Sequence, residues 1–551
     1  MLTGTSAEAA KRPRIRALSL DSGRRWVQLL LLCFAISCGA LANASANASA
    51  NASVLSRIDA KPIAFFAPGF VRTVYVAAGD TALWNEPQLQ RLRSLIETAP
   101  EHGLDPADYL YQQLPSSGVL DSLTGDARYD ADLIATEAFL RFGYHLQYGK
   151  VDPLALDTAW NYGREVEMKD PAAVVVALIR SPDLTEAIKP LVRHGPLYAR
   201  LRGWLKTYRE MEEQGGWSAV SAGPTLKPGD RHEWVAELRA RLNAEGFTSS
   251  AEDGSFFDDS LLTAAKSWQE RHGLEADGVI GARSLAALNQ PAADLVDRIR
   301  VNLERLRWAA PERHERALLV NIAGFTLQLR GDGKIRWTTR VMVGKPWRQT
   351  PVFRSSMTYL VLNPDWTVPP TILRKDTLPA IRKDPGYLTK QHMDVFTANA
   401  RPVNPQSIDW SSFDKQRFPY FIRQRPGPWN ALGQVKFIFP NDHFVFLHDT
   451  PGRDLFARSE RSFSSGCIRV DQPLDLAALL LEDQSGYSRS EIDTLVASGE
   501  SRTVFLKQPM PVLLQYLTAA ELESGQFRFH RDIYKRDAKV LAALNVSPPA
   551  G

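Results

Sequence analysis

The sequence predicts a multidomain α+β protein in which helices and strands occupy separate stretches of the chain. Three patterns support this prediction. Apolar residues recur at helical spacing between about residues 54 and 223, a compact helical unit follows to about residue 290, and strand-like runs begin at residue 317. The chain has 551 residues, 44% of them hydrophobic, so it is long enough to bury several separate cores.

Residues 1–46 are predicted to be a signal peptide or an N-terminal anchor. Basic residues between Lys11 and Arg25 precede an apolar run from Trp26 to Leu41, and small residues follow at alternate positions up to Ala46. This order is typical of a secretory signal peptide. An uncleaved anchor is the alternative, because the apolar run is only marginally long for a membrane span.

Charge and cysteine content exclude two classes of protein. The chain has 66 basic and 62 acidic residues; residues 1–53 hold six of the basic and two of the acidic ones, which leaves 60 against 60. A neutral chain has no electrostatic motive for binding nucleic acid. Cys33 and Cys38 lie in the apolar run, so Cys467 is the single cysteine after cleavage, and a disulfide framework is excluded.

Two helical units are predicted next. Residues 47–225 are expected to be a linker and a helical domain, whose His102, His145 and His194 lie too far apart in sequence for a metal site and are expected to be structural. Residues 226–290 are expected to form three short helices around one core. The first helix ends at Gly246, and a tight turn at residues 277–281 precedes the third.

Residues 291–510 are predicted to form a mostly-β domain. Strand-like runs occupy residues 317–322, 325–330, 335–343, 357–362, 435–439 and 444–448. From about residue 371 to 425 this rhythm is lost, and a long irregular insertion of this kind is usually a lid or a binding loop. Residues 511–551 are expected to complete the helical and β-rich regions.

Cys467 is the candidate nucleophile of a cysteine acyl-transfer site. His448, at the end of a predicted strand, would act as the base and hold Cys467 in a thiolate/imidazolium pair. Asp449, or its carbonyl, is the natural group to orient the imidazole. Gly466 permits a sharp turn, and backbone N–H groups around Gly466 and Cys467 are expected to form an oxyanion hole.

Residues 226–290 resemble the peptidoglycan-binding module of cell-wall enzymes. The resemblance depends on turn glycines and core positions together: Gly229, Leu238-x-x-x-Leu242, Gly246-Phe247, Asp253-Gly254, Ala265-x-x-Trp268-Gln269 and Asp277-Gly278-x-x-Gly281. A helical spacer that has lost affinity for the wall is the alternative, because a fold does not guarantee a function.

The β-rich region resembles the L,D-transpeptidases of the YkuD type, and in particular the large periplasmic YcbB-like subfamily, which also has a helical scaffold domain. The motifs that carry the resemblance are His448-x-Thr450, Ser464-x-Gly466-Cys467-x-Arg469, Asn363-Pro364-x-Trp366 and Asn430-x-Leu432-Gly433. Many family members have histidine where this chain has Ser465, which argues against a second catalytic histidine and leaves His448 as the base.

The resemblance implies a periplasmic acyltransferase that needs no metal or organic cofactor. It implies attack of Cys467 on a tetrapeptide stem of peptidoglycan, release of D-alanine, and transfer to the amine of a second stem in a 3→3 cross-link. It further implies inhibition by carbapenem β-lactams, work beside glycan polymerases and D,D-carboxypeptidases, and a capping role for the insertion. The expected substrate-binding residues are Arg469, Ser464, Ser465, Thr450, Trp366 and Asn430.

Three alternatives stay open. Water in place of the amine would make the protein an L,D-carboxypeptidase or another hydrolase with the same nucleophile. A non-catalytic wall-binding scaffold would leave Cys467 without a chemical role. A metal hydrolase built on His443 and His448 is disfavoured, because residues five apart on a strand point to opposite faces.

Overall fold

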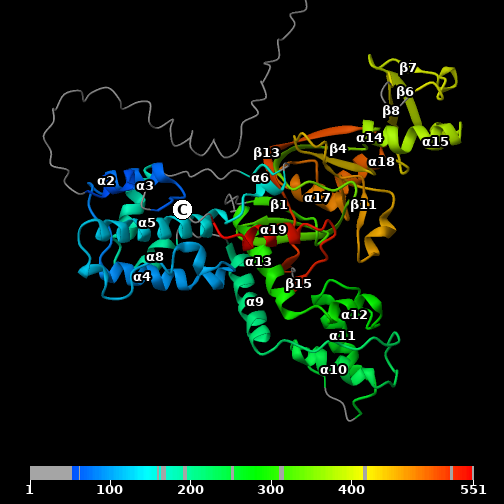
Figure 1. Cartoon of the computed structure of the whole chain (residues 1–551). Coiled ribbons are helices and arrows are strands. Elements are labelled where there is room, and N and C mark those ends of the chain that lie inside the picture. Colours follow the sequence, from blue (N-terminus) through cyan, green and yellow to red (C-terminus); the bar gives the residue numbers. More distant parts are fainter. Residues whose placement is uncertain are drawn as a thin grey trace, which may run out of the picture.

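The computed structural model describes residues 53–548, apart from residues 61–62, 158–159, 163–168, 190–194, 250–252, 310–315, 414–417 and 522–524. The predicted signal or anchor and His194 lie outside the described residues. In the part that is described, no helix combines the length and the apolar character needed to cross a membrane. A helical domain, a three-helix unit and a β-rich domain extend in different directions from a central helix, α13 (Figure 1).

The helical domain confirms the helical periodicity of the N-terminal region. Its helix α4 shows why these residues form helices: the Asn85 side chain accepts from the N–H of Gln88, whose side chain bonds back to Asn85, and Leu89, Leu92 and Ile96 are buried. The helices are α2 (Val54–Asp59), α3 (Pro68–Ala77), α4 (Glu86–Glu97), α5 (Gly125–Tyr148), α6 (Pro153–Leu156), α7 (Pro171–Ile179), α8 (Leu184–Ile188) and α9 (Gly195–Glu213).

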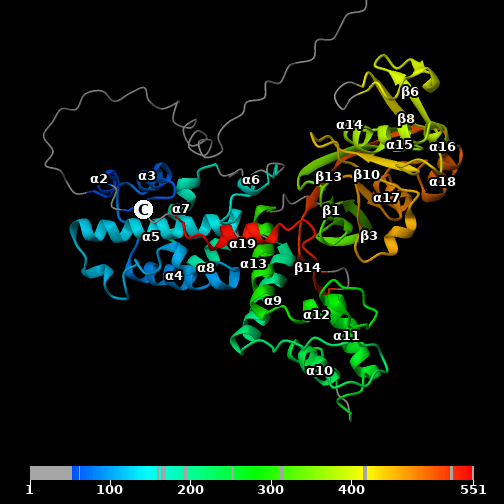
Figure 2. The ribbon, with the colours of Figure 1, turned by 45° about the vertical axis from the view of Figure 1, so that its right-hand side comes forward.

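Helix α13 (Ala292–Trp308) lies inside the region predicted to be mostly β. It packs beside α9, and α19 (Asp537–Asn545) near the C-terminus lies against it, so distant segments of the chain meet here (Figure 2). Its polar residues Asn302, Glu304 and Arg307 are fully buried. Leu295, Val296, Ile299, Leu303 and Leu306 are buried at regular helical spacing, so the sequence does carry the pattern of this helix, although the region was predicted to be mostly β.

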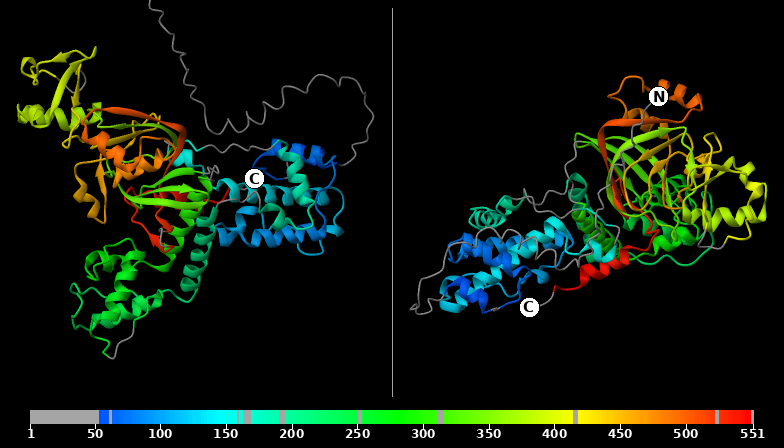
Figure 3. Two further views of the ribbon diagram at one scale, coloured as in Figure 1. Left: turned by 180° about the vertical axis from the view of Figure 1, so that it is seen from behind. Right: turned by 90° about the horizontal axis from the view of Figure 1, so that it is seen from above.

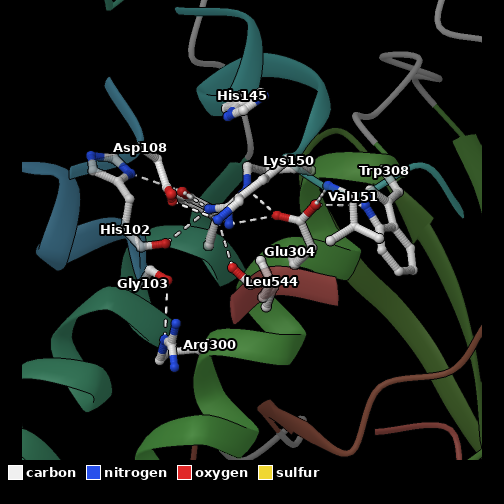
Figure 4. Close-up of polar contacts among 12 residues, drawn as sticks. His102, Gly103, Asp108, His145, Lys150, Val151, Arg300, Glu304, Trp308 and Leu544 are labelled. Carbon is white, nitrogen blue, oxygen red and sulfur yellow. Dashed lines mark hydrogen bonds and ion pairs between the residues drawn. The ribbon is translucent and has the colours of Figure 1, made fainter. Parts of the chain in front are cut away.

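A buried polar network fixes the helical domain to α13 (Figure 4). Glu304 accepts from the backbone N–H of Val151 at 2.7 Å, from Trp308 Nε1 at 2.9 Å and from Arg307 at 2.8 Å. A side chain at Gly149, whose φ is 87°, would come within 2.5 Å of Glu304 Oε1, so glycine is required there. Lys150 Nζ donates to Asp108 at 2.5 Å and to the carbonyl of Leu544 in α19 at 2.7 Å.

The three-helix unit has the predicted elements, α10 (Trp234–Ala244), α11 (Asp259–Arg271) and α12 (Ala282–Leu288). Leu238, Leu242 and Trp268 form the centre of its core. The unit is docked on the C-terminal hairpin of β14 (Ala519–Glu521) and β15 (Phe527–Phe529). A Cβ atom at Gly273 would lie 2.5 Å from the carbonyl oxygen of Phe529, so the two backbones meet without space for a side chain.

Nine strands form the sheet of the β-rich domain, in the order β11-β3-β12-β10-β9-β4-β13-β1-β2. Because β2 also pairs with β3, the sheet closes on itself. The strands are β1 (Arg316–Asn321), β2 (Thr326–Gly331), β3 (Lys334–Gly344), β4 (Arg354–Leu362), β9 (Val435–Ile438), β10 (Leu447–His448), β11 (Ser462–Ser464), β12 (Ile468–Val470) and β13 (Arg502–Gln515). Helices α17 (Pro473–Leu480) and α18 (Arg489–Ala497) precede β13.

Two boundaries differ from the sequence predictions. The strand expected at residues 444–448 is reduced to Leu447–His448, because the backbone of Phe444 has a positive φ of 54° and interrupts the extended chain. The division expected between residues 510 and 511 falls inside β13, which pairs with β4 on one side and with β1 on the other.

The insertion has its own secondary structure, so its predicted irregularity is wrong. Four strands, β5 (Trp366–Thr367), β6 (Met393–Thr397), β7 (Pro402–Val403) and β8 (Tyr420–Gln424), pair in the order β5-β8-β6-β7. With α14 (Pro370–Ile372), α15 (Leu378–Lys383) and α16 (Tyr387–Lys390) they enclose a small core that includes Val395 and Ile422. The insertion projects from the sheet away from the helical domain (Figure 3).

Candidate active site

Cys467 lies in a tight turn between β11 and β12. The hydroxyl of Ser464 donates to the carbonyl of Cys467 at 2.5 Å and accepts from the N–H of Gly466 at 3.1 Å. Thr350, in the loop between β3 and β4, donates to the carbonyl of Gly466 at 2.8 Å. Gly466 has a φ of 122°, which L side chains rarely adopt, so the turn needs glycine at this position.

These hydrogen bonds correct the role predicted for Gly466. Its N–H is already bound to Ser464 and is not free to stabilise an oxyanion. The N–H of Cys467 has no partner among the described residues and is the donor that the turn leaves available. Ser464 therefore shapes the turn. Its hydroxyl was expected to contact the substrate, but it is buried and bonded to the backbone of Gly466 and Cys467.

His448 lies in the middle of a row of three side chains that crosses three strands. It is paired with Lys436 on β9 and with Arg469 on β12. Residues directly paired across neighbouring strands share one face of the sheet, with Cβ atoms about 5 Å apart. The imidazole therefore has a cation on each side. Arg469 follows Cys467 by two residues, so the row lies next to the turn that holds Cys467.

The imidazole of His448 is oriented by a main-chain carbonyl. Its Nδ1 donates to the carbonyl oxygen of Asp449 at 2.5 Å, which leaves Nε2 as the acceptor nitrogen. The sequence proposed either the carboxylate or the carbonyl of Asp449 as the orienting group, and in the structure it is the carbonyl that bonds to the ring. The Asp449 carboxylate instead accepts from the N–H of Gln434 at 2.8 Å and from Arg453 at 3.0 Å.

Burial favours the neutral form of both reactive groups over the expected thiolate/imidazolium pair. Burial lowers the pKa of His448 to about 3, with Arg469 and Lys436 acting in the same direction. Burial also raises the pKa of the Cys467 thiol to about 11, although the backbone N–H of Phe446, Arg469 and Lys436 partly oppose this rise. The partly exposed thiol bonds to the carbonyl of Phe444 at 3.6 Å, and among the described residues no hydrogen bond joins it to His448.

Lys436 and Phe444 are site residues that the strand pattern alone did not identify. Lys436 becomes a neighbour of His448 only through the register of β9 and β10. Phe444 is 83% exposed, and its strained backbone directs its carbonyl to Cys467. The Asn441 side chain braces this loop through bonds to the backbone of Phe439 and Val445.

Of the expected substrate contacts, Ser465 is the most accessible. It is exposed beside the thiol and accepts from Arg348 Nη1 at 2.8 Å. Arg348 also pairs with Asp376 of the insertion, at 2.7 and 3.0 Å, so it links the nucleophile turn to the insertion. Thr450 is buried next to His448, and its hydroxyl accepts from the N–H of Gly452 at 3.3 Å.

The structure contradicts a direct substrate contact for Asn430. Its side chain is fully buried, donates to the carbonyls of Pro364 and Arg425, at 3.0 and 2.9 Å, and accepts from the N–H of Leu432 at 2.8 Å. Asn430 therefore holds the base of the insertion. Trp366 is half-buried and packs against the core of the insertion, so it shapes the site through that core.

Over the described ranges, no three His, Cys, Asp or Glu side chains are grouped so that they could hold a metal ion. The two histidines weighed for such a site have other contacts. The ring of His443 packs against Phe353 with centroids 5.2 Å apart, and that of His448 lies 5.7 Å from Phe446.

Three family models match the chain. The model of the L,D-transpeptidase catalytic domain, YkuD, matches residues 315–494, that of a scaffold domain matches residues 69–205, and that of a "Putative peptidoglycan binding domain" matches residues 231–288. The predicted fold class, with a helical scaffold, a small three-helix domain and a mostly-β domain with an insertion, is confirmed, as is the resemblance to this family of catalytic domains.

A curated protein of Haemophilus influenzae with the description "Putative L,D-transpeptidase" is 37% identical over 254 residues, which are 46% of this chain and 51% of that protein. The chain therefore spans about half the length of this relative. Solved L,D-transpeptidases from Xylanimonas cellulosilytica and Stackebrandtia nassauensis are each 14% identical; they match over 53% of this chain and 98% and 97% of their own, with TM-scores of 0.17 and 0.20. The assignment depends on the family models and on the Haemophilus relative, not on these two structures.

Proposed function

We propose that this chain, which matches the models of the YkuD L,D-transpeptidase catalytic domain and of a "Putative peptidoglycan binding domain", forms 3→3 cross-links between peptidoglycan stems through a thioester on Cys467. The observation that carries the proposal is the arrangement of the turn and the row. A partly exposed thiol lies in the turn that leads into β12, and Arg469 of β12 is paired with a histidine whose free nitrogen is an acceptor and whose other neighbour is Lys436.

In the first half-reaction the donor is a tetrapeptide stem. Nε2 of His448 accepts the proton of the Cys467 thiol as the sulfur attacks the carbonyl carbon of the third residue. The N–H of Cys467 stabilises the resulting oxyanion. The bond to the fourth residue then breaks, and His448 gives its proton to the departing amine, so that D-alanine leaves and a thioester remains.

In the second half-reaction the side-chain amine of a diamino acid on a neighbouring stem attacks the thioester carbonyl. His448 accepts the proton of this amine and returns it to the sulfur when the thioester breaks. The site is then restored, and neither half-reaction needs a metal or an organic cofactor. Because burial favours the neutral form of both reactive groups, the proposed proton transfer accompanies the attack of the sulfur.

The surroundings of the reaction belong to the same proposal. We place the protein in the periplasm, exported or anchored by residues 1–46, with the three-helix domain holding the catalytic domain close to the wall. Glycan polymerases and D,D-carboxypeptidases would supply the strands and the tetrapeptide donors. Carbapenems, which carry a reactive carbonyl, would acylate Cys467.

The test is mass spectrometry of muropeptides after tetrapeptide-rich sacculi are incubated with the purified protein lacking residues 1–46. New 3→3 dimers are expected with the wild type and none with the Cys467→Ala variant. Tripeptides without dimers would assign water as the acceptor and make the protein an L,D-carboxypeptidase. No change with either protein would contradict catalysis and favour a wall-binding scaffold.

A further inference from the structure

Two cations beside His448 have no anionic partner in the described part of the chain. Neither Lys436 nor Arg469 makes an ion pair or a side-chain hydrogen bond there, and the Nε atom of Arg469 is buried without an acceptor. The ammonium of Lys436 lies 5.5 Å from the centre of the Phe446 ring. Asp365 is the acidic residue whose charge acts on the pKa of Lys436, but it is already paired with Arg423 at 3.2 Å.

Three cations whose side chains are almost fully buried, unlike the half-buried Lys436 and Arg469, each have an acidic partner. Arg307 bonds to Glu304 at 2.8 Å, Lys150 bonds to Asp108 at 2.5 Å, and Arg241 bonds to Glu245 at 3.0 Å. A charge taken from water without a partner costs free energy, so two such charges on either side of His448 indicate an anionic ligand. Burial lowers the pKa of both Lys436 and Arg469, which agrees with positions withdrawn from water.

We propose that Lys436 and Arg469 bind the terminal carboxylate of the donor stem peptide, the carboxylate that leaves with D-alanine. This inference rests on the proposed transpeptidase function. The carboxylate is separated by one carbon from the amine that His448 must protonate, so a donor placed for this proton transfer brings its carboxylate to one of the two neighbours of His448 in the row.

The pair also explains how the site tells a donor from an acceptor. A tetrapeptide has a free carboxylate one residue beyond the bond that is broken, whereas the acceptor reacts through a side-chain amine, whose positive charge the two cations repel. The carboxylate leaves with D-alanine, and the cations then favour the neutral form of the incoming amine, which is the form that attacks.

The experiment compares two synthetic tetrapeptide donors, one with a free C-terminal carboxylate and one with a C-terminal carboxamide. The readout is the ratio of kcat/KM for release of D-alanine and of D-alaninamide, measured by mass spectrometry. For the wild type the acid should be preferred by about tenfold or more, as expected for hydrogen bonds to a charged group. In Lys436→Met the ratio should fall at least threefold, chiefly through KM for the acid, because only Arg469 remains to bind the carboxylate, and Lys436→Arg should restore much of it.

Lys390→Met is the matched control, because Lys390 pairs with Asp384 of the insertion and lies outside the row. It should retain the wild-type ratio. The inference is overturned if Lys436→Met keeps the acid preference, or if the wild type has none. Failure of the proposed function is a separate result: the wild type would then release neither product and form no adduct on Cys467.

Discussion

The clusters around Glu245 and His448 treat buried charge in opposite ways. Glu245 accepts from Arg241 at 3.0 Å, His272 at 2.6 Å, Tyr208 at 2.8 Å and Trp268 at 2.8 Å. Around His448, the cations Lys436 and Arg469 have no acceptor within the described residues. The fully hydrogen-bonded Glu245 joins helices to one another, because Tyr208 of α9 is one of its donors. The unpaired cations beside His448 leave hydrogen-bond donors available for a ligand.

The largest effect is expected from removal of the base. His448→Gln keeps most of the side-chain volume but cannot accept a proton, so D-alanine release from a tetrapeptide should fall about 10²–10⁴-fold. The melting temperature should change little. A variant rate within threefold of the wild type would show that the imidazole is not the base. The cluster around His448 would then have no demonstrated catalytic role.

Glu245→Leu should have the opposite consequence, a loss of stability with chemistry preserved. Removal of one partner from a buried ionic cluster costs about 3–5 kcal/mol, because Arg241 and His272 are left unpaired. Urea unfolding followed by tryptophan fluorescence measures this cost, and kcat on a soluble tetrapeptide should be unchanged. The exposed Glu233→Gln is the control and should stay within about 0.5 kcal/mol of the wild type.

The pH dependence of unfolding sharpens this result. Burial alone would raise the pKa of Glu245, but His272 and Arg241 outweigh it and lower the pKa to about 2 from 4.5. A carboxylate whose pKa is lowered by folding contributes stability above pH 4.5, and this contribution is lost as the pH falls toward 2. Glu245→Leu should lack this acid-dependent part of the loss; an identical acid profile in the variant would contradict the assignment.

A smaller effect concerns the ionisation of the nucleophile. Because burial raises the pKa of Cys467 to about 11, its alkylation by iodoacetamide should increase with pH without a plateau below about pH 10. Loss of a cation in Lys436→Met should raise this pKa further. Intact-protein mass spectrometry follows the alkylation. A plateau near neutral pH in the wild type would mean that a thiolate is present at rest, and the neutral site described above would be wrong.

The smallest effect is expected from Ser464→Ala. Loss of the two hydrogen bonds that shape the turn should cost about 1–2 kcal/mol of stability. It should also lower the rate of D-alanine release, because the N–H of Cys467 is no longer held in place. Ser465→Ala, next to it but exposed, is the matched control for stability. Equal stability of the two variants would show that the hydrogen bonds of Ser464 do not stabilise the turn.

The sequence identified Cys467 and His448 because they lie in short motifs of characteristic residue types. It could not reveal Lys436 as a neighbour of His448, since that contact depends on how β9 and β10 pair. The N–H of Gly466 and the side chain of Asn430 were given functional roles, but each is used by a local hydrogen bond that no spacing pattern reports.

The same limit applies to the fold. The three-helix unit was predicted well because each of its helices has a regular apolar face and a glycine turn. The sheet of the insertion was missed because two of its strands, Trp366–Thr367 and Pro402–Val403, are too short for an alternating pattern to be visible. Helix α13 has a regular apolar face, so its helical pattern was present in the sequence; what the sequence could not show is that Glu304 and Arg307 are buried by partners far away in the chain.

The most direct measurement is the intact mass of the protein after brief incubation with a tetrapeptide donor and acid quenching. The wild type should gain the mass of the donor minus that of D-alanine, peptide mapping should place this mass on Cys467, and Cys467→Ala should gain nothing. Release of D-alanine without an adduct, at the same rate in both proteins, would contradict a thioester on Cys467 and with it the proposed mechanism.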